Sequence, residues 1–157
     1  IQGVLLSKAE RFRLPLRFAF LGSAAFGGIE GFLRKRPAMP KKIEASIVVE
    51  AVGNKPKLIR EFFGHVNSGQ GDLSIARMSS PAGWEEPGQR PEFDEYTLVL
   101  SGRMIVETES GPIELGPDQA IHTRAGEWIR YTTPEDTEYV AVCRPAFSPD
   151  TVHRDPL

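Results

Sequence analysis

The chain has 157 residues, of which 40% are apolar and 25% charged, and its formal net charge is −2. This composition excludes a disordered or membrane-embedded protein, and the length suffices for one domain with one hydrophobic core. Residues 1–38 hold seven basic and two acidic side chains, which leaves 12 basic and 19 acidic ones in residues 39–157. A body with this acidic balance argues against a nucleic-acid partner.

Residues 1–38 form an N-terminal extension with two open interpretations. Their Arg-rich, acid-poor composition is typical of an organelle transit peptide. Alternatively, Met39 is the true start, the protein is cytoplasmic, and the preceding residues arise from mistranslation or cloning. The longest stretch without a charge, residues 18–29, has 12 residues. A bilayer-spanning helix needs about 20, so we expect no membrane partner.

After residue 44 the pattern changes to short apolar runs. Residues 47–49 (IVV) are a β-branched run, and residues 57–63 (KLIREFF) predict a brief helical turn. Gly- and Pro-containing turns separate the later runs, which predicts an all-β domain. These runs are Leu73–Met78, Tyr96–Leu100, Met104–Glu107, Pro112–Leu115, Ala120–Thr123, Trp128–Thr132 and Tyr139–Cys143. The clearest hairpin covers residues 106–115, with Glu109-Ser110-Gly111 as its turn.

The sequence lacks the signatures of common catalytic machinery. It contains no catalytic triad, phosphate-binding loop or dinucleotide fingerprint, so hydrolase and nucleotide-dependent functions have no support. The single cysteine, Cys143, cannot form an internal disulfide, and we expect it to be buried and unreactive. The three histidines, His65, His122 and His153, are scattered along the chain without metal-ligand spacing. Whether the protein is an enzyme stays open at this stage.

Two segments carry a resemblance to a known family. Glu95 and Gly102 keep the glutamate-to-glycine spacing of the first conserved cupin motif, and Pro81-Ala82-Gly83 is similar to its opening. Residues 116–129 resemble the second motif. The resemblance covers residues 59–155 and implies a cupin jelly-roll β-barrel (double-stranded β-helix, RmlC-like) as a single domain over residues 39–157.

The chain departs from the family at the positions that usually bind metal. The two histidine positions of the first motif fall on Gly88 and Arg90, or on Gln89 and Pro91 if the alignment shifts by one residue. The histidine of the second motif falls on Ile129. Only Glu95 matches a usual cupin ligand, and one carboxylate cannot form a transition-metal site by itself. We therefore expect a barrel without the usual transition-metal site. The cofactor stays unknown at this stage, with none or a divalent metal as the alternatives.

The same register predicts which side chains face the barrel interior. Glu95 and Thr97 share one face of their strand, and Tyr131 shares the inward face of a later strand with Ile129. If Arg90 also points inward, its guanidinium pairs with Glu95 and depresses the pKa of that carboxyl. His122 either faces the barrel or has a structural role. The predicted ligand-binding residues are Gln89, Arg90, Glu95, Thr97, His122 and Tyr131.

Three functional hypotheses follow. The first is a cupin that binds a small polar molecule inside the barrel without a transition metal. The second is a metal-dependent oxygenase or isomerase, in which carboxylate and amide side chains between residues 85 and 95 hold a hard ion such as Mn²⁺ or Mg²⁺. The third is a scaffold that binds a partner protein. In each case we expect a homodimer, with residues 47–49 as the paired or exchanged strand.

Overall fold

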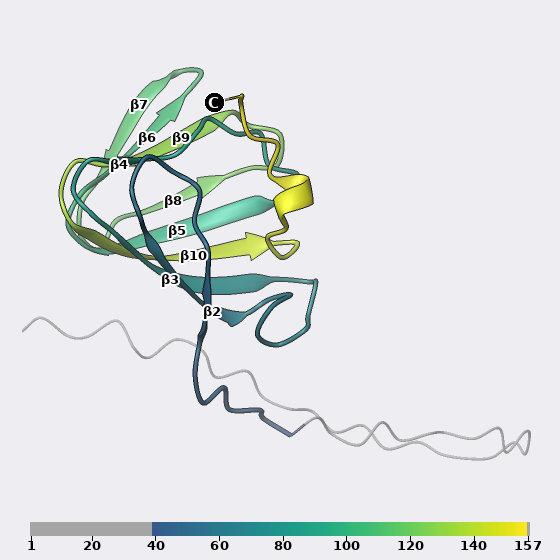
Figure 1. Cartoon of the computed structure of the whole chain (residues 1–157). Coiled ribbons are helices and arrows are strands. Elements are labelled where there is room, and N and C mark those ends of the chain that lie inside the picture. The colour runs from purple at the N-terminus through teal and green to yellow at the C-terminus, as the bar shows by residue number, and fades with distance from the viewer. Residues whose placement is uncertain (1–38, 157) are drawn as a thin grey trace, which may run out of the picture. The chain divides into compact units, whose positions relative to one another are not determined.

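The computed structural model describes residues 39–156, in which nearly all regular structure is β-strand (Figure 1). The strands of this region are β1 (Ile47–Val49), β2 (Leu58–Phe63), β3 (Ser74–Ser80), β4 (Trp84–Glu85), β5 (Asp94–Ser101), β6 (Met104–Thr108), β7 (Gly111–Leu115), β8 (Ala120–Thr123), β9 (Ile129–Thr133) and β10 (Thr137–Arg144). A short 3₁₀ turn, Pro149–Thr151, follows β10. The expected all-β class is confirmed.

The strands form two antiparallel sheets. The larger sheet has the order β1-β2-β3-β10-β5-β8, and the smaller has the order β4-β9-β6-β7. Neighbours in the sheets are mostly distant in sequence, as in a jelly roll. β10 is central, since it pairs along its length with both β3 and β5. Figure 1 shows the hairpin of β6 and β7 next to β9, apart from the layer of β5, β8 and β10.

Alternating side chains position the core between the sheets. Along β5, Glu95, Thr97 and Val99 are buried, whereas Tyr96 and Leu98 are exposed on the outer face. This period of two is the pattern of a strand with one face toward a core. The main core cluster draws on both sheets and consists of Trp84, Val99, Met104, Val106, Leu115, Ile129, Tyr131 and Tyr139. A smaller cluster of Phe93, Cys143 and Val152, with Phe147 packed against it, lies around the C-terminal segment.

Gly102 determines how closely β5 and β6 can be connected. Its φ is +78°, in the left-handed region that favours glycine. A Cβ atom there would lie 2.2 Å from the backbone oxygen of Asp136. The turn therefore excludes any side chain, which explains the glycine that the motif places at this position.

Residues 57–63 form a strand and not the predicted helical turn. Leu58–Phe63 is β2, which pairs with β1 on one side and β3 on the other. The carboxylate of Glu61 accepts backbone hydrogen bonds from Val66 (2.9 Å) and Asn67 (2.8 Å) and so closes the turn that follows the strand. The short apolar run fits a helical or a strand period, and pairing within the sheet decides between them.

The predictions for the N-terminal extension lie outside the described residues. The two interpretations of residues 1–38 therefore stay predictions. Within residues 39–156, no helix is long and apolar enough to cross a membrane.

The structure places the expected dimer strand at one end of the larger sheet. β1 pairs with β2 on one side only within the described region, and 41% of Ile47 and 62% of Val48 are exposed. Such an apolar edge can pair with a second copy. We expect the protein to be a homodimer by light scattering at micromolar concentration, and Val48→Lys to shift it toward the monomer.

The matched control is Leu98→Lys on the outer face of β5, where 41% of Leu98 is exposed. This variant should stay dimeric. A monomeric wild-type protein, or dissociation by Leu98→Lys alone, would rule out pairing through β1.

Candidate functional site

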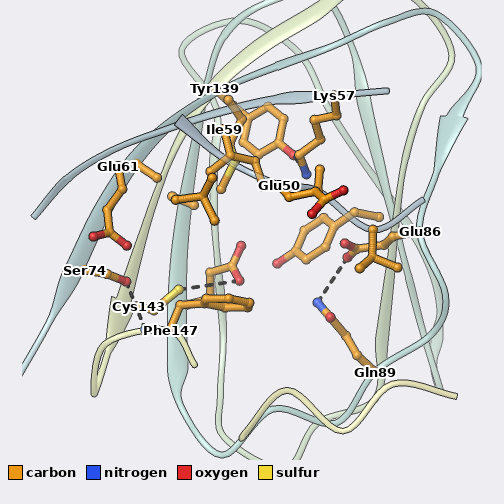
Figure 2. Close-up of a pocket in the computed structure, with 18 of the residues that line it drawn as sticks. Glu50, Lys57, Ile59, Glu61, Ser74, Glu86, Gln89, Tyr139, Cys143 and Phe147 are labelled. Atoms are coloured by element: carbon orange, nitrogen blue, oxygen red, sulfur yellow. Dashed lines mark hydrogen bonds between the residues drawn. The ribbon is translucent and has the colours of Figure 1, made fainter. Parts of the chain in front are cut away.

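A cavity of about 90 Å³ lies in the barrel between the two hydrophobic clusters. One enclosed water needs roughly 10–15 Å³, so the space is large enough for a small organic molecule. Its wall combines polar and apolar groups from both sheets and from the segments beside them (Figure 2). The lining residues are Val49–Val52, Lys57, Ile59, Glu61, Ser74, Ala76, Met78, Glu86, Gln89, Phe93, Glu95, Tyr131, Tyr139, Ala141, Cys143, Phe147 and Arg154.

Glu95 holds a buried carboxyl group in the cavity wall. β5 directs it inward, where its Oε1 accepts a hydrogen bond of 2.8 Å from the Thr97 hydroxyl. Its Oε2 accepts from the Cys143 thiol, with 3.9 Å between sulfur and oxygen. Burial raises the pKa of Glu95 above its usual value, although the Thr97 hydrogen bond and the charge of Lys57 act in the opposite direction. Burial therefore favours the protonated form of this carboxyl more than exposure to water would.

Glu86 is a second buried carboxyl in the cavity wall. Its Oε1 accepts a hydrogen bond of 3.0 Å from Nε2 of Gln89, which Figure 2 shows. Burial raises the pKa of Glu86 from 4.5 to about 7; the charge of Glu95 adds to this rise, and Lys57 and Arg154 oppose it. Glu86 can therefore accept or release a proton near neutral pH.

Gln89 is held rigidly by its backbone. Its N–H donates to the carbonyl of Ile129 (2.9 Å), and its own carbonyl accepts from the N–H of Ile129 (3.0 Å). The side-chain Nε2 donates to Glu86, whereas the buried Oε1 has no hydrogen-bond partner among the described residues. A buried acceptor without a partner is costly, and a bound molecule or water would satisfy it.

Two tyrosines and one lysine complete the polar wall. The Tyr131 hydroxyl lies 3.4 Å from Oγ1 of Thr123, and burial, followed by the charge of Glu95, raises the pKa of Tyr131 well above its usual value. Nζ of Lys57 donates to the Tyr139 hydroxyl at 2.7 Å. The same ammonium lies 3.8 Å from the centroid of a Trp84 ring, a cation–π contact. Lys57 thus brings a fixed positive charge next to the carboxyl groups.

Four of the six predicted ligand-binding residues point into the barrel. Gln89, Glu95 and Tyr131 line the cavity, and the buried Thr97 supports Glu95 from behind. Whether they bind a ligand remains a prediction.

Arg90 does not form the expected pair with Glu95. The side chain of Arg90 is half exposed, forms an ion pair with Glu109 and donates to the carbonyl of Gly126 at 3.1 Å. It lies on the opposite side of its segment from Gln89, because neighbouring residues of an extended chain face opposite ways. The predicted depression of the Glu95 pKa is wrong for the same reason, since no guanidinium offsets the burial of that carboxyl.

His122 lies on the outer face of the larger sheet. In the β5–β8 register it is opposite Tyr96, and its neighbour Thr123 is opposite Glu95. Opposed residues share a face, so Thr123 faces inward and His122 stacks on Tyr96 outside, with ring centroids 4.2 Å apart. The expectation that His122 faces the barrel is not met.

The described residues do not supply the ligand set of a cupin metal centre. His122 is outside the barrel, and His153 is half exposed and contacts Glu92. Of the acidic side chains between residues 85 and 95, only Glu86 and Glu95 turn inward. No group of three or more His, Cys, Asp or Glu side chains within residues 39–156 converges on one point. The hypothesis of a site built from carboxylate and amide side chains stays a prediction, because Glu86, Gln89 and Glu95 all line the cavity.

Several lining residues were not predicted from the sequence as ligand-binding residues. Lys57 precedes β2, and Arg154 follows the last strand, so neither lies in the motif region. Glu86 belonged to the acidic stretch that was considered for a hard ion, but nothing in that stretch distinguishes it from the exposed Glu85. Cys143 is buried as expected, and burial raises the pKa of its thiol.

Sequence comparison leaves the family open. No family model matches the chain. A curated relative, Endoribonuclease YbeY of Myxococcus xanthus, is 35% identical over 101 residues, which are 63% of this chain and 34% of that protein. The chain thus spans about a third of the length of this relative.

Structural comparison shows the fold. A cupin superfamily protein from Desulfitobacterium hafniense matches with a TM-score of 0.52 and 16% identity, over 61% of this chain and 83% of that one. Streptomyces PAC13 with uridine matches with a TM-score of 0.61 and 15% identity, over 78% of this chain and 93% of that one. The polyketide cyclase RemF from Streptomyces resistomycificus matches with a TM-score of 0.59 and 22% identity, over 76% of this chain and 87% of that one. These identities are too low to transfer an activity.

The Glu86 carboxyl predicts a pH dependence of stability. Its pKa is raised in the folded state, so its contribution is fully present below about pH 4.5 and is lost as pH rises through about 7. The shift of the Glu86 pKa corresponds to a change of about 3 kcal/mol in the free energy of unfolding. Glu86→Gln keeps a hydrogen-bond acceptor for Gln89 but cannot ionise. The variant should therefore gain stability relative to the wild type, by up to that amount, between about pH 4 and about pH 8.

Urea unfolding at both pH values measures this difference. Glu114→Gln, on an exposed strand, is the control and should show no such trend. An equal gap between wild type and Glu86→Gln at both pH values would mean that Glu86 ionises normally.

The position of Arg90 predicts a nearly silent substitution. Exposed ion pairs contribute about 0–1 kcal/mol. Arg90→Met should therefore change the free energy of unfolding by no more than about 1 kcal/mol, and it should show no coupling to Glu95→Gln in a double-mutant cycle. A coupling energy of about 2 kcal/mol or more would instead support a buried ion pair between Arg90 and Glu95.

Proposed function

Since residues 39–156 adopt the cupin fold, we propose that this chain binds a small polar molecule in the barrel, beside Gln89, Glu95 and Tyr131, without a transition metal. The observation that carries the proposal is the cavity itself. Members of both hydrophobic clusters line it, and its wall includes Gln89, whose buried amide oxygen has no partner among the described residues. An apolar pocket with a few convergent polar groups is the usual form of a small-molecule site.

The endoribonuclease activity named for the M. xanthus relative is not part of this proposal. The matched region is a third of that protein, and residues 39–157 of this chain have 12 basic against 19 acidic side chains. Binding of a nucleic-acid backbone depends on basic surfaces. The charge of this region therefore supports a small molecule over RNA.

Filling the cavity tests the proposal. Ala141 lies on β10 in the cavity wall and is 3% exposed. Ala141→Leu replaces a methyl group by an isobutyl group and should occupy the space of the ligand. Native mass spectrometry of the full chain should detect a small molecule retained by the wild type and lost from Ala141→Leu. Ala120→Leu, on the exposed surface of β8, is the control and should retain it.

Elemental analysis of the same samples separates the metal alternative. Stoichiometric Fe, Mn, Ni or Zn that survives dialysis would contradict the metal-free proposal. Equal retention of the ligand by Ala141→Leu would show that the molecule binds elsewhere.

A further inference from the structure

The hydrogen-bonding groups of the cavity wall indicate which chemical groups a ligand in the cavity needs. On the acceptor side, Oε1 of Gln89 has no partner in residues 39–156, and Oε2 of Glu95 lies 3.9 Å from the sulfur of Cys143. Glu86 accepts one bond from Gln89. A molecule in the cavity that contacts these acceptors must bring hydrogen-bond donors.

Some donors of the wall remain free. Lys57 uses one of its three N–H donors for Tyr139, and the buried Nε of Arg154 has no partner among the described residues. The ligand therefore needs at least one acceptor atom in addition to its donors.

The charge of the wall and the volume of the cavity restrict the class of ligand further. The carboxyl groups of Glu50, Glu61, Glu86 and Glu95 line the cavity, whereas Lys57 and Arg154 are the basic residues in its wall. An anionic ligand would lie against these carboxyl groups. The volume of about 90 Å³ is well below the roughly 300–1,000 Å³ of pockets for drug-sized ligands. A molecule of few heavy atoms fits.

Building on the proposed function, we propose that the ligand is a small, uncharged, hydroxylated molecule of the polyol type. A hydroxyl group both donates and accepts, so it can serve Gln89 and Glu95 as a donor and Arg154 as an acceptor. A carboxylate or phosphate offers no donor for Gln89 and is repelled by the neighbouring carboxyl groups. An alkylammonium offers donors but no acceptor for Arg154.

The methionines provide a site-specific readout. Met78 lines the cavity, Met104 is fully buried in the core cluster, and 83% of Met39 is exposed. The full chain, labelled with ¹³C at the methionine methyl groups, is titrated with glycerol, glycerate and propylamine at constant ionic strength. We expect glycerol to shift the Met78 resonance saturably at millimolar concentration and to leave Met104 and Met39 unchanged. Glycerate and propylamine should bind at least about tenfold more weakly, a difference of about 1.4 kcal/mol.

A pair of glutamine variants tests the contact itself. Gln89→Leu removes the free acceptor and should weaken glycerol binding about tenfold. Gln70→Leu is the control, since Gln70 lies outside the cavity wall and should leave the affinity unchanged.

The outcomes separate this inference from the proposed function. If glycerate or propylamine shifts Met78 at lower concentration than glycerol, the cavity is a binding site but the ligand class is wrong. If none of the three probes shifts Met78, the polyol class is overturned, whereas the proposed function is judged by ligand retention in the Ala141→Leu experiment.

Discussion

Glu86 and Glu95 place two carboxyl groups inside a barrel whose wall is otherwise largely aliphatic and aromatic. An ionised carboxylate loses its hydration there, which costs several kilocalories per mole unless partners replace the water. The chain supplies the Thr97 hydroxyl for one, the Gln89 amide for the other, and the Lys57 ammonium near both. These partners offset the desolvation only in part, because the pKa of both groups stays raised. Protonation is therefore part of how this interior remains stable.

The fold was predictable from the sequence wherever apolar runs end at residues with special backbone freedom. The strands on both sides of Gly102 are an example, since the tight turn accepts no side chain and the alternation from Glu95 onward identifies the buried face. Residues 57–63 show where this reasoning fails. Their apolar side chains fit a helical period and a strand period alike, and pairing with β1 and β3, which one segment cannot reveal, selects the strand.

The sequence predicted the inward-facing site residues only where side chains alternate between the two faces of an extended segment. Counting back in steps of two from Glu95 places Gln89 inward and Arg90 outward, and the structure has this arrangement. The gap-free family alignment favoured Arg90 because it counted residues across an irregular segment before β5. Lys57 and Arg154 had no local signal, since they reach the cavity from opposite ends of the domain. Such residues can be identified as part of the cavity wall only from the folded structure, in which the two sheets pack together.

Two side chains at positions that the motif resemblance aligns with histidines bear on the proton chemistry of the site. They are Gln89, in the register shifted by one residue, and Ile129, which is 1% exposed in the main core. Backbone hydrogen bonds join the two residues, so an amide and a hydrocarbon side chain lie next to each other at these positions. Neither can ligate a transition ion with useful strength. Lys57 and hydrogen-bond donors face the two buried carboxyl groups, but they offset the cost of desolvation only in part. Burial therefore raises the pKa of Glu86 to about 7, so this carboxyl can exchange a proton near neutral pH.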